Sequence, residues 1–350
     1  MKKFLSAILT LAIVFSCTIT SFAAAPEDAG TKKTVENSGY SFEITEYVDE
    51  YNRIIRTYEN NNIQTRSAPD LAKTKAVLVA LGMQEENVNM LNTEALNQFA
   101  LSREITIATA YTKTDGNNNV SYLPEDEAIA AASSLKAKQD AIKFSYAQQG
   151  AVTRAADYED TFEDSYMRVD YAVTYRGDGE YFYSVDSEWL TMPAFRFTDS
   201  LGACAMNGTI TTDSQYGYYW YDSTFINMGN VTKDYTFEYI NDNYGNDVDG
   251  NWYGSAGYFN LPNDVYSEYS SIIHDNFGAH FQYSGHVTSP DEQRWFNTVG
   301  NYTHATLSVA LSPSISIDYS GSLSASVGID VVGDTDIRGV EFEINYIPDN

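Results

Sequence analysis

Residues Tyr166–Val185, YMRVDYAVTYRGDGEYFYSV, decide the fold class of this chain. Polar side chains alternate with aromatic and β-branched ones over Tyr166–Tyr175 and over Tyr181–Val185. Such alternation is typical of half-buried strands, and the Gly and Asp residues between the two runs suit a tight turn. The stretch therefore predicts a β-hairpin.

The same period of two recurs to the end of the chain, with no helical run between the strands. Tyr accounts for 28 of the 350 residues, and aromatic side chains suit half-buried pleated surfaces. We therefore interpret the tyrosine content first as a property of the fold. Short strands at these intervals predict a β-sandwich or an open barrel. The further predicted strands are Tyr218–Phe225, Tyr235–Ile240, Phe277–Tyr283 and Val340–Ile347.

Helical patterns are confined to the N-terminal half. A first helix is predicted from Ser67 to Gly82 and a second from Thr93. A long helix, rich in Ala, Lys and Gln, is predicted over residues 124–148. Asp115-Gly116 predicts a hairpin turn between the second and the long helix.

These patterns predict an α+β N-terminal unit followed by an all-β C-terminal domain that is β-sandwich-like. The composition changes near residue 155, which we take as the boundary. The expected organisation is a leader at residues 1–23, a polar segment at 24–66, a small α+β domain at 67–154 and a Tyr-rich β-sandwich-like domain at 155–350.

The first residues have the features of an export signal. Lys2 and Lys3 are followed by an apolar run, residues 4–15, that is too short to span a bilayer as a helix. Ser21–Ala23 fits the small-x-small pattern of a cleavage site. We expect cleavage near Ala23 and release outside the cell.

The two cysteines suggest lipidation as an alternative to free release, and they argue against an internal disulfide. Val14–Cys17 could form a lipoprotein box, with Cys17 as the lipidated residue, although Phe15 is bulky for that motif. Cleavage near Ala23 leaves only Cys204, so no internal disulfide can form. Its apolar neighbours predict a buried thiol.

The net charge narrows the range of partners. The chain carries 21 basic and 48 acidic residues, a formal charge of −27 at pH 7. Such a field repels nucleic acid and anionic lipid headgroups. An extracellular protein or glycan is the expected partner, and a membrane enters only under the pore-forming alternative below.

Two stretches resemble known exported proteins. They are AVLVALGMQEENVNMLNTEALNQFALSREITIATAY at Ala76–Tyr111 and EWLTMPAFRFTDSLGACAM at Glu188–Met206. Both are similar to segments of exported proteins from clostridia-like Gram-positive bacteria, a group without an assigned activity. The resemblance covers about a third of the chain, implies secretion and assigns no functional residue.

Four aromatic residues are candidate binding residues: Tyr219, Trp220, Trp252 and Tyr253. Exposed flat rings can stack on sugars or pack against a partner protein. Alternation along a strand must turn about half of such rings inward, so packing in the core remains an alternative for each.

Two features are candidate cation sites. His274, His280 and His286 are six residues apart, a spacing that would place them on one face of a straight strand and that suggests a transition metal. Residues 246–251, NDVDGN, resemble a calcium loop but lack the acidic residues that an EF-hand requires. The alternatives are hydrogen-bonded histidines and an ordinary turn, with no cofactor at all.

Leu307–Val331 has the most regular pattern in the sequence. Odd positions are mostly apolar and even positions mostly serine over the whole stretch. A three-residue loop at 320–322 would pair Tyr319 with Leu323 and keep one face apolar. Such a hairpin could insert into a membrane as part of a β-pore, or it could cover the core of a sandwich.

Common catalytic motifs are missing from the sequence: we find no Gly-x-Ser-x-Gly, no His-Glu-x-x-His and no nucleotide-binding glycine loop. The leading hypothesis is therefore a secreted, non-enzymatic binding protein. The alternatives are a pore former that uses residues 307–331 and a metal-dependent enzyme at the three histidines.

Overall fold

The computed structural model describes most of the chain beyond the predicted leader. The predicted leader, including Cys17, lies outside the described residues. Within the described part of the chain, no helix is long and apolar enough to cross a membrane. The described ranges are 30–60, 68–117, 119–149, 164–192, 196, 198–227, 230–240, 244–249, 252–267, 270–287, 295–305, 314–319, 325–330 and 335–345.

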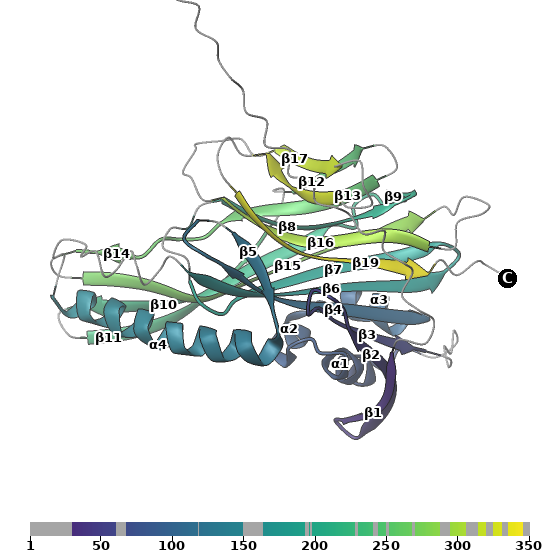
Figure 1. Cartoon of the computed structure of the whole chain (residues 1–350), viewed down its shortest axis with the longest axis horizontal. Coiled ribbons are helices and arrows are strands. Elements are labelled where there is room, and N and C mark those ends of the chain that lie inside the picture. The colour runs from purple at the N-terminus through teal and green to yellow at the C-terminus, as the bar shows by residue number, and fades with distance from the viewer. Residues whose placement is uncertain are drawn as a thin grey trace, which may run out of the picture.

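A large antiparallel sheet forms the centre of the molecule (Figure 1). Its main path runs through β1 (Thr31–Asn37), β2 (Tyr40–Val48), β3 (Ile54–Glu59), β4 (Glu104–Thr114), β6 (Ser165–Gly177), β7 (Glu180–Trp189), β15 (Ser270–Val287), β10 (Tyr216–Asn227) and β11 (Asn230–Tyr239). Three short strands extend the sheet: β5 (Val120–Leu123) beside β4, and β9 (Gly208–Ile210) and β14 (Val265–Tyr266) beside β15.

A smaller antiparallel sheet packs on one face of the large one. Its strand order is β12 (Tyr244–Asp249), β13 (Trp252–Asn260), β8 (Thr198–Met206), β16 (Trp295–Ala305) and β19 (Thr335–Asn345). A two-stranded sheet, β17 (Ser314–Tyr319) with β18 (Ala325–Asp330), makes no strand pairing with either of the other described sheets.

Tyrosine is the commonest residue in the space between the two sheets. Tyr171 and Tyr183 of the large sheet and Tyr253 of the small one are fully buried in one core. Buried hydroxyls need partners, and they find them across the interface: the hydroxyls of Tyr183 and Tyr253 lie 2.6 Å apart. The hydroxyl of Tyr283 donates to the carbonyl of Ala203 at 3.0 Å. The expected β-rich, sandwich-like architecture is thus confirmed, with tyrosine as its core residue.

Three short helices cover the other face of the large sheet. They are α1 (Leu71–Ala80), α2 (Glu85–Met90) and α3 (Thr93–Ala100), and their apolar sides pack on β2 and β4. The side chains of Asp70 and Asn92 cap α1 and α3 by accepting backbone N–H groups. The helix predicted to begin at Thr93 is α3, which begins at that residue, whereas α2 was not predicted.

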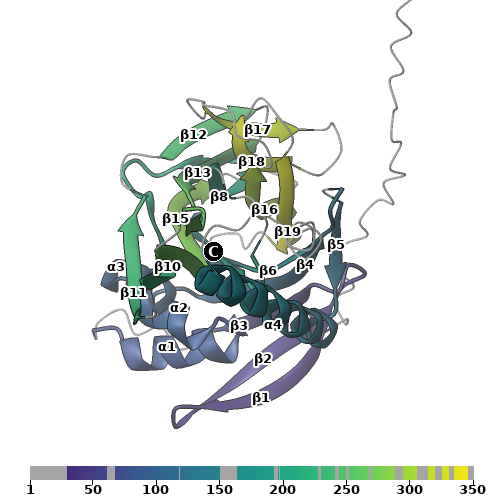
Figure 2. The same ribbon diagram turned by 90° about the vertical axis from the view of Figure 1, so that its left-hand side faces the viewer.

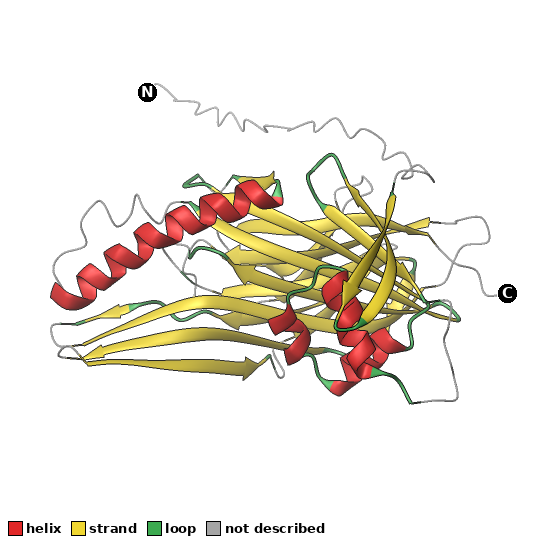
Figure 3. Cartoon of the chain, turned by 90° about the horizontal axis from the view of Figure 1, so that it is seen from below, coloured by secondary structure: helices red, strands yellow, loops and turns green. Residues whose placement is uncertain are grey.

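The long helix α4 (Glu125–Gln149) lies apart from the other three (Figure 3). It crosses the end of the sandwich that faces the viewer in Figure 2. Ala128 and Ala132 are buried against the sheet, whereas Ile129 and Phe144 remain exposed. Its bounds agree with the predicted helix over residues 124–148.

The structure differs from the expected two-unit organisation at residue 155. Strand β4, from the expected α+β unit, pairs with β6 along its whole length, from Glu104 opposite Tyr175 to Thr114 opposite Ser165. One sheet therefore runs through both parts of the chain. The composition changes near residue 155 because α4 is inserted between two strands that are neighbours in space.

The first prediction concerns Glu104, which lies opposite Glu59 in the β3–β4 ladder. Burial, with the charge of Glu59, raises the pKa of Glu104 to about 7. Because the folded pKa lies above the unfolded one, the protonated carboxyl favours the fold at low pH, and this contribution is lost as the pH rises through 7. We expect Glu104→Gln to stabilise the protein more at pH 8 than at pH 5, by on the order of 2 kcal/mol.

Urea unfolding at both pH values measures this difference. Glu43→Gln serves as the control, because Glu43 is an exposed carboxylate on β2. Parallel stability profiles for the wild type and Glu104→Gln would contradict the assignment.

Candidate functional site

The four aromatic candidates do not share a surface. Tyr253 is part of the core between the sheets, and Trp252 is buried on the opposite face of β13. On β10, Trp220 is 9% exposed, while Tyr219 is half-buried and stacks on Phe259 with 5.0 Å between ring centroids. Adjacent residues on a strand point to opposite faces, so neither pair can form one flat platform.

The three histidines lie on one strand, β15, but do not converge. Six residues along a strand span about 20 Å, so sharing a face still leaves them far apart. No group of three or more His, Cys, Asp or Glu side chains is arranged to hold a metal within the part of the chain that the structure describes. Each histidine has partners of its own: Ser223 for His274 (2.9 Å), Gln282 and Asp186 for His280 (2.8 and 3.0 Å), and Glu180 for His286 (3.4 Å).

The calcium-like segment forms a strand rather than a loop. Asn246–Asp249 belongs to β12 and pairs with β13, from Asn246 opposite Ser255 to Asp249 opposite Trp252. The loop that an EF-hand type of calcium site requires is therefore not formed at Asn246–Asp249. Residues 250 and 251 lie outside the described ranges.

The described parts of the serine-rich segment, Ser314–Tyr319 and Ala325–Asp330, pair in a different register from the predicted one, and residues 307–313, 320–324 and 331 lie outside the described ranges. Tyr319 pairs with Ala325 rather than with Leu323, and Ile315 pairs with Ile329. Odd positions still face odd positions, because the alternation fixes only that the loop has an odd number of residues. It does not fix the length of that loop.

This hairpin lies against β8, β12, β13 and β16 of the smaller sheet, in the upper part of Figure 2. Cys204, Trp252, Ala256 and Val299 form a small buried cluster on that sheet, apart from the tyrosine core. Its position favours the interpretation in which the hairpin covers a core, rather than the pore-forming interpretation. The expected burial of the Cys204 thiol is confirmed.

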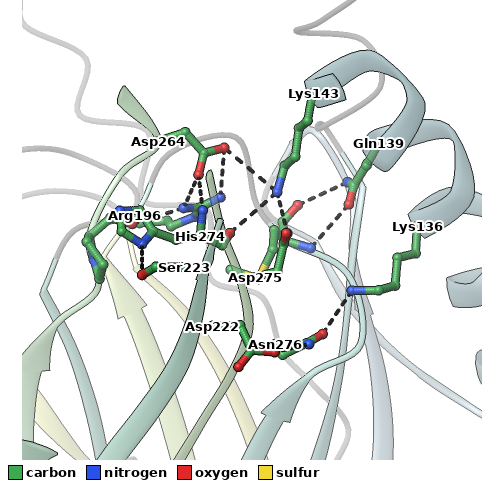
Figure 4. Close-up of polar contacts among 12 residues, drawn as sticks. Lys136, Gln139, Lys143, Arg196, Asp222, Ser223, Asp264, His274, Asp275 and Asn276 are labelled. Carbon is green, nitrogen blue, oxygen red and sulfur yellow. Dashed lines mark hydrogen bonds and ion pairs between the residues drawn. The ribbon is translucent and has the colours of Figure 1, made fainter. Parts of the chain in front are cut away.

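A buried charged cluster lies where α4 meets β15 (Figure 4). Strand β15 pairs with β7 from Gly278 onward, and β14 pairs with it only at Ser271 and Ile272. On the other side from β10, His274 thus lies between the ends of these two neighbours, and its outward backbone groups need other partners. Asp264 accepts the N–H of His274 at 2.8 Å, and the ammonium of Lys143 lies 3.5 Å from its carbonyl oxygen.

The charges in this cluster balance. Lys143 lies 2.6 Å from Asp275 and 3.7 Å from Asp264, and Arg196 contacts Asp264 at 2.9 Å. Burial acts to raise the pKa of Asp264, but Arg196 and Lys143 outweigh it and hold that pKa below its usual value. Two cations and two carboxylates, joined by hydrogen bonds, therefore replace strand pairing at a gap in the sheet.

The Ser223–His274 pair beside this cluster has the residue types of a nucleophile and its base. Burial, followed by the charge of Arg196, lowers the pKa of His274, so its ring is neutral at pH 7. Ser223 and His274 are only 3% and 8% exposed, and an attacking hydroxyl must reach its substrate. We therefore interpret the pair as part of the packing between β10 and β15.

The cluster fastens α4 to the sheet and was not predictable from sequence. Gln139 reinforces it by donating to the carbonyl of Met192 at 3.1 Å. Lys143 lies in an Ala- and Lys-rich helix, where a lysine is normally solvated, and its partners are more than a hundred residues away.

The exposed surface offers a more accessible site, on edge strand β11. Among the described strands, β11 pairs only with β10. Along β11, Val231, Tyr235, Phe237 and Tyr239 alternate with polar residues and share one face. We call these four residues the aromatic edge. The hydroxyl of Tyr235 donates to the sulfur of Met90 at 3.4 Å, which places α2 on the same side of the sheet.

The opposite edge of the large sheet is built differently. On β1, Lys32 and Lys33 form ion pairs with Glu43 and Glu46 of β2. Charged edge strands prevent association with other strands. Strand β11 also carries charged residues, Lys233, Asp234 and Glu238, but it exposes large aromatic rings beside them.

Comparison with known proteins adds little to this picture. No family model matches the chain, and no curated protein matches it. A search of solved structures found the collagen-binding subdomain of the Enterococcus faecalis surface protein ACE. The two are 7% identical with a TM-score of 0.19, over 48% of this chain and 88% of that one. At this score the likeness carries no argument about fold or ligand.

The second prediction tests the charged cluster. Lys143→Met keeps the approximate volume but leaves the buried Asp264 and the half-buried Asp275 with less positive charge beside them. Removing one partner of a buried ion pair typically costs about 3–5 kcal/mol, and we expect a loss of that size in urea unfolding.

Lys136→Met is the matched control, because Lys136 lies on the same helix and makes an exposed hydrogen bond to Asn276. We expect it to change stability by less than about 0.5 kcal/mol. Similar effects of the two substitutions would show that the buried cluster does not hold α4.

Proposed function

We propose that this chain is an exported, non-enzymatic binding protein that holds an extracellular protein or glycan on its aromatic edge. The observation that carries the proposal is the exposure of large rings on an edge strand: Tyr235 is 53% exposed and Tyr239 is 54% exposed. Exposed tyrosines of this kind commonly contribute much of the binding energy at interfaces.

The rings of the aromatic edge are held in place before any ligand binds. Phe237 lies 4.9 Å from Tyr218 and 5.2 Å from Tyr239 between ring centroids. Tyr216 supports Tyr239 from the neighbouring strand at 5.9 Å. Because these contacts restrict the rings, a ligand loses little of its binding energy to ordering them.

Charge and the leader support the rest of the proposal. A net charge of −27 disfavours nucleic acid and anionic membranes and favours neutral or basic ligands. The basic start and apolar run within residues 1–23 support export. The resemblance to exported bacterial proteins supports the same compartment.

The third prediction removes the exposed rings. The mature protein is tested against a glycan array and a panel of purified extracellular proteins. We expect Tyr235→Ser combined with Tyr239→Ser to weaken binding to the ligand at least about tenfold, because hot-spot tyrosines contribute that much or more.

Tyr51→Ser is the control, since Tyr51 is an exposed tyrosine in the turn between β2 and β3 (39% exposed). It should bind within about twofold of the wild type. The proposal fails if the wild type retains no member of either panel, or if the double variant binds as well as the wild type.

A further inference from the structure

This inference rests on the proposed function and concerns what occupies the aromatic edge. In the β10–β11 hairpin, the register runs without a shift from Tyr218 opposite Tyr239 to Asn227 opposite Asn230. Just beyond it, the N–H of Ile240 donates to the carbonyl of Gly217 at 2.8 Å. Hydrogen-bonded pairs alternate along an antiparallel ladder, so even-numbered residues of β11 bond to β10. The odd-numbered ones direct their N–H and C=O groups away from it.

The outward backbone groups and the aromatic side chains therefore belong to the same residues. Val231, Tyr235, Phe237 and Tyr239 are odd-numbered, and so is Lys233. Their N–H and C=O groups form a row that faces no other strand within the described residues, and the N–H of Tyr235 donates to the side chain of Asp234 at 2.9 Å. Their side chains lie on the face shared with α2. An added strand would bond to this row, replacing Asp234 at Tyr235, and would pack on the side chains.

The other face of β11 is acidic. It carries Asp234 and Glu238 between threonines and an asparagine. The hydroxyl of Tyr219 donates to Glu238, which holds that carboxylate at the surface. A strand laid against β11 would thus meet apolar rings on one face and carboxylates on the other.

We propose that β11 accepts an extended segment of a partner polypeptide as an additional antiparallel strand, with apolar side chains facing the aromatic edge and basic side chains facing Asp234 and Glu238. Main-chain hydrogen bonds would hold the segment, and the alternation would select it.

Charge argues against a second copy of this chain as the occupant. Two copies each carry a net charge of −27, and pairing β11 with β11 would bring their acidic faces together. Like charges opposite each other destabilise a ladder. A basic segment gains from the same field.

The experiment uses a fluorescein-labelled synthetic peptide of about nine alternating lysine and valine residues, a typical strand length. Binding to the full mature protein is measured by fluorescence anisotropy at physiological salt. A peptide of the same composition, with lysines and valines in separate blocks, controls for simple charge attraction. We expect the alternating peptide to bind at least tenfold tighter.

N-methylation gives a test of the hydrogen bonds themselves. In antiparallel pairing, the valines opposite odd-numbered β11 residues direct their N–H groups toward β11. N-methylation of the valines should abolish binding, whereas N-methylation of the lysines should change it less than twofold. Equal effects of the two modifications would overturn strand addition.

The matching change in the protein is Lys233→Pro, with Lys233→Ala as its control. Proline removes an outward N–H but no bond to β10, and edge strands tolerate it there. We expect Lys233→Pro to weaken binding at least tenfold and Lys233→Ala less than twofold, with unchanged thermal unfolding for both. Equal binding by the two variants would refute the proposal.

The two proposals can fail separately. If the alternating peptide does not bind but a ligand from the panel is lost on replacing Tyr235 and Tyr239, strand addition is wrong and the binding function stands. If neither the peptide nor any panel member binds, both are wrong.

Discussion

Hydrogen bonds made by buried tyrosines hold the two sheets in one relative position, and the rest of the structure depends on that position. Tyr183 and Tyr253 come from opposite sheets, and the hydroxyl of one donates to that of the other in the core. The hydroxyl of Tyr283 donates in the same way to the carbonyl of Ala203 on the smaller sheet. A phenylalanine core would tolerate sliding of one sheet over the other. Paired hydroxyls do not, because any shift would leave a buried polar atom without a partner. The tyrosines thereby fix the relative position of the sheets as well as filling the space between them.

The second constraint is the continuity of the large sheet. Its strands come from both halves of the chain. After β5 the chain leaves the sheet to form α4, and it re-enters the sheet at β6. The helix must therefore be fastened separately, and Lys143 does this at the gap beside β15. An ion cluster suits this place because the gap exposes backbone groups that an apolar side chain could not satisfy.

Many strands and helices of the fold were predictable because they depend on local pattern, although β8, β13 and β16 of the smaller sheet were not predicted. The period of Tyr166–Tyr175, the turn at Asp115-Gly116 and the start of a helix at Thr93 are all visible within a few residues. The join between β4 and β6 was not, because alternation shows that a residue run is a strand but not which strand lies next to it. The same limit applies to the hairpin at Leu307–Val331, where parity was correct and the register was displaced by two residues.

The candidate sites show this limit more clearly. The even spacing of His274, His280 and His286 suggested a shared face, yet along one strand it also guarantees separation. Trp252 and Tyr253 were chosen as a cluster of aromatic residues, and alternation sends one ring to each side of β13. The alternation from Val231 to Tyr239 is present in the sequence. Whether it forms a binding surface depends on β11 being the last strand of the sheet, and only the three-dimensional arrangement shows that position.

The order of strands in the sheet differs from their order in the chain, and this governs when the aromatic edge comes into existence. Among the described strands, the β10–β11 hairpin joins the main sheet through β15, which begins 31 residues after the hairpin ends (Tyr239 to Ser270) and pairs on its other side with β7. A nascent or shortened polypeptide that stops before Ser270 would carry the hairpin without a place to attach it. Assembly of the surface therefore waits for the distal part of the chain.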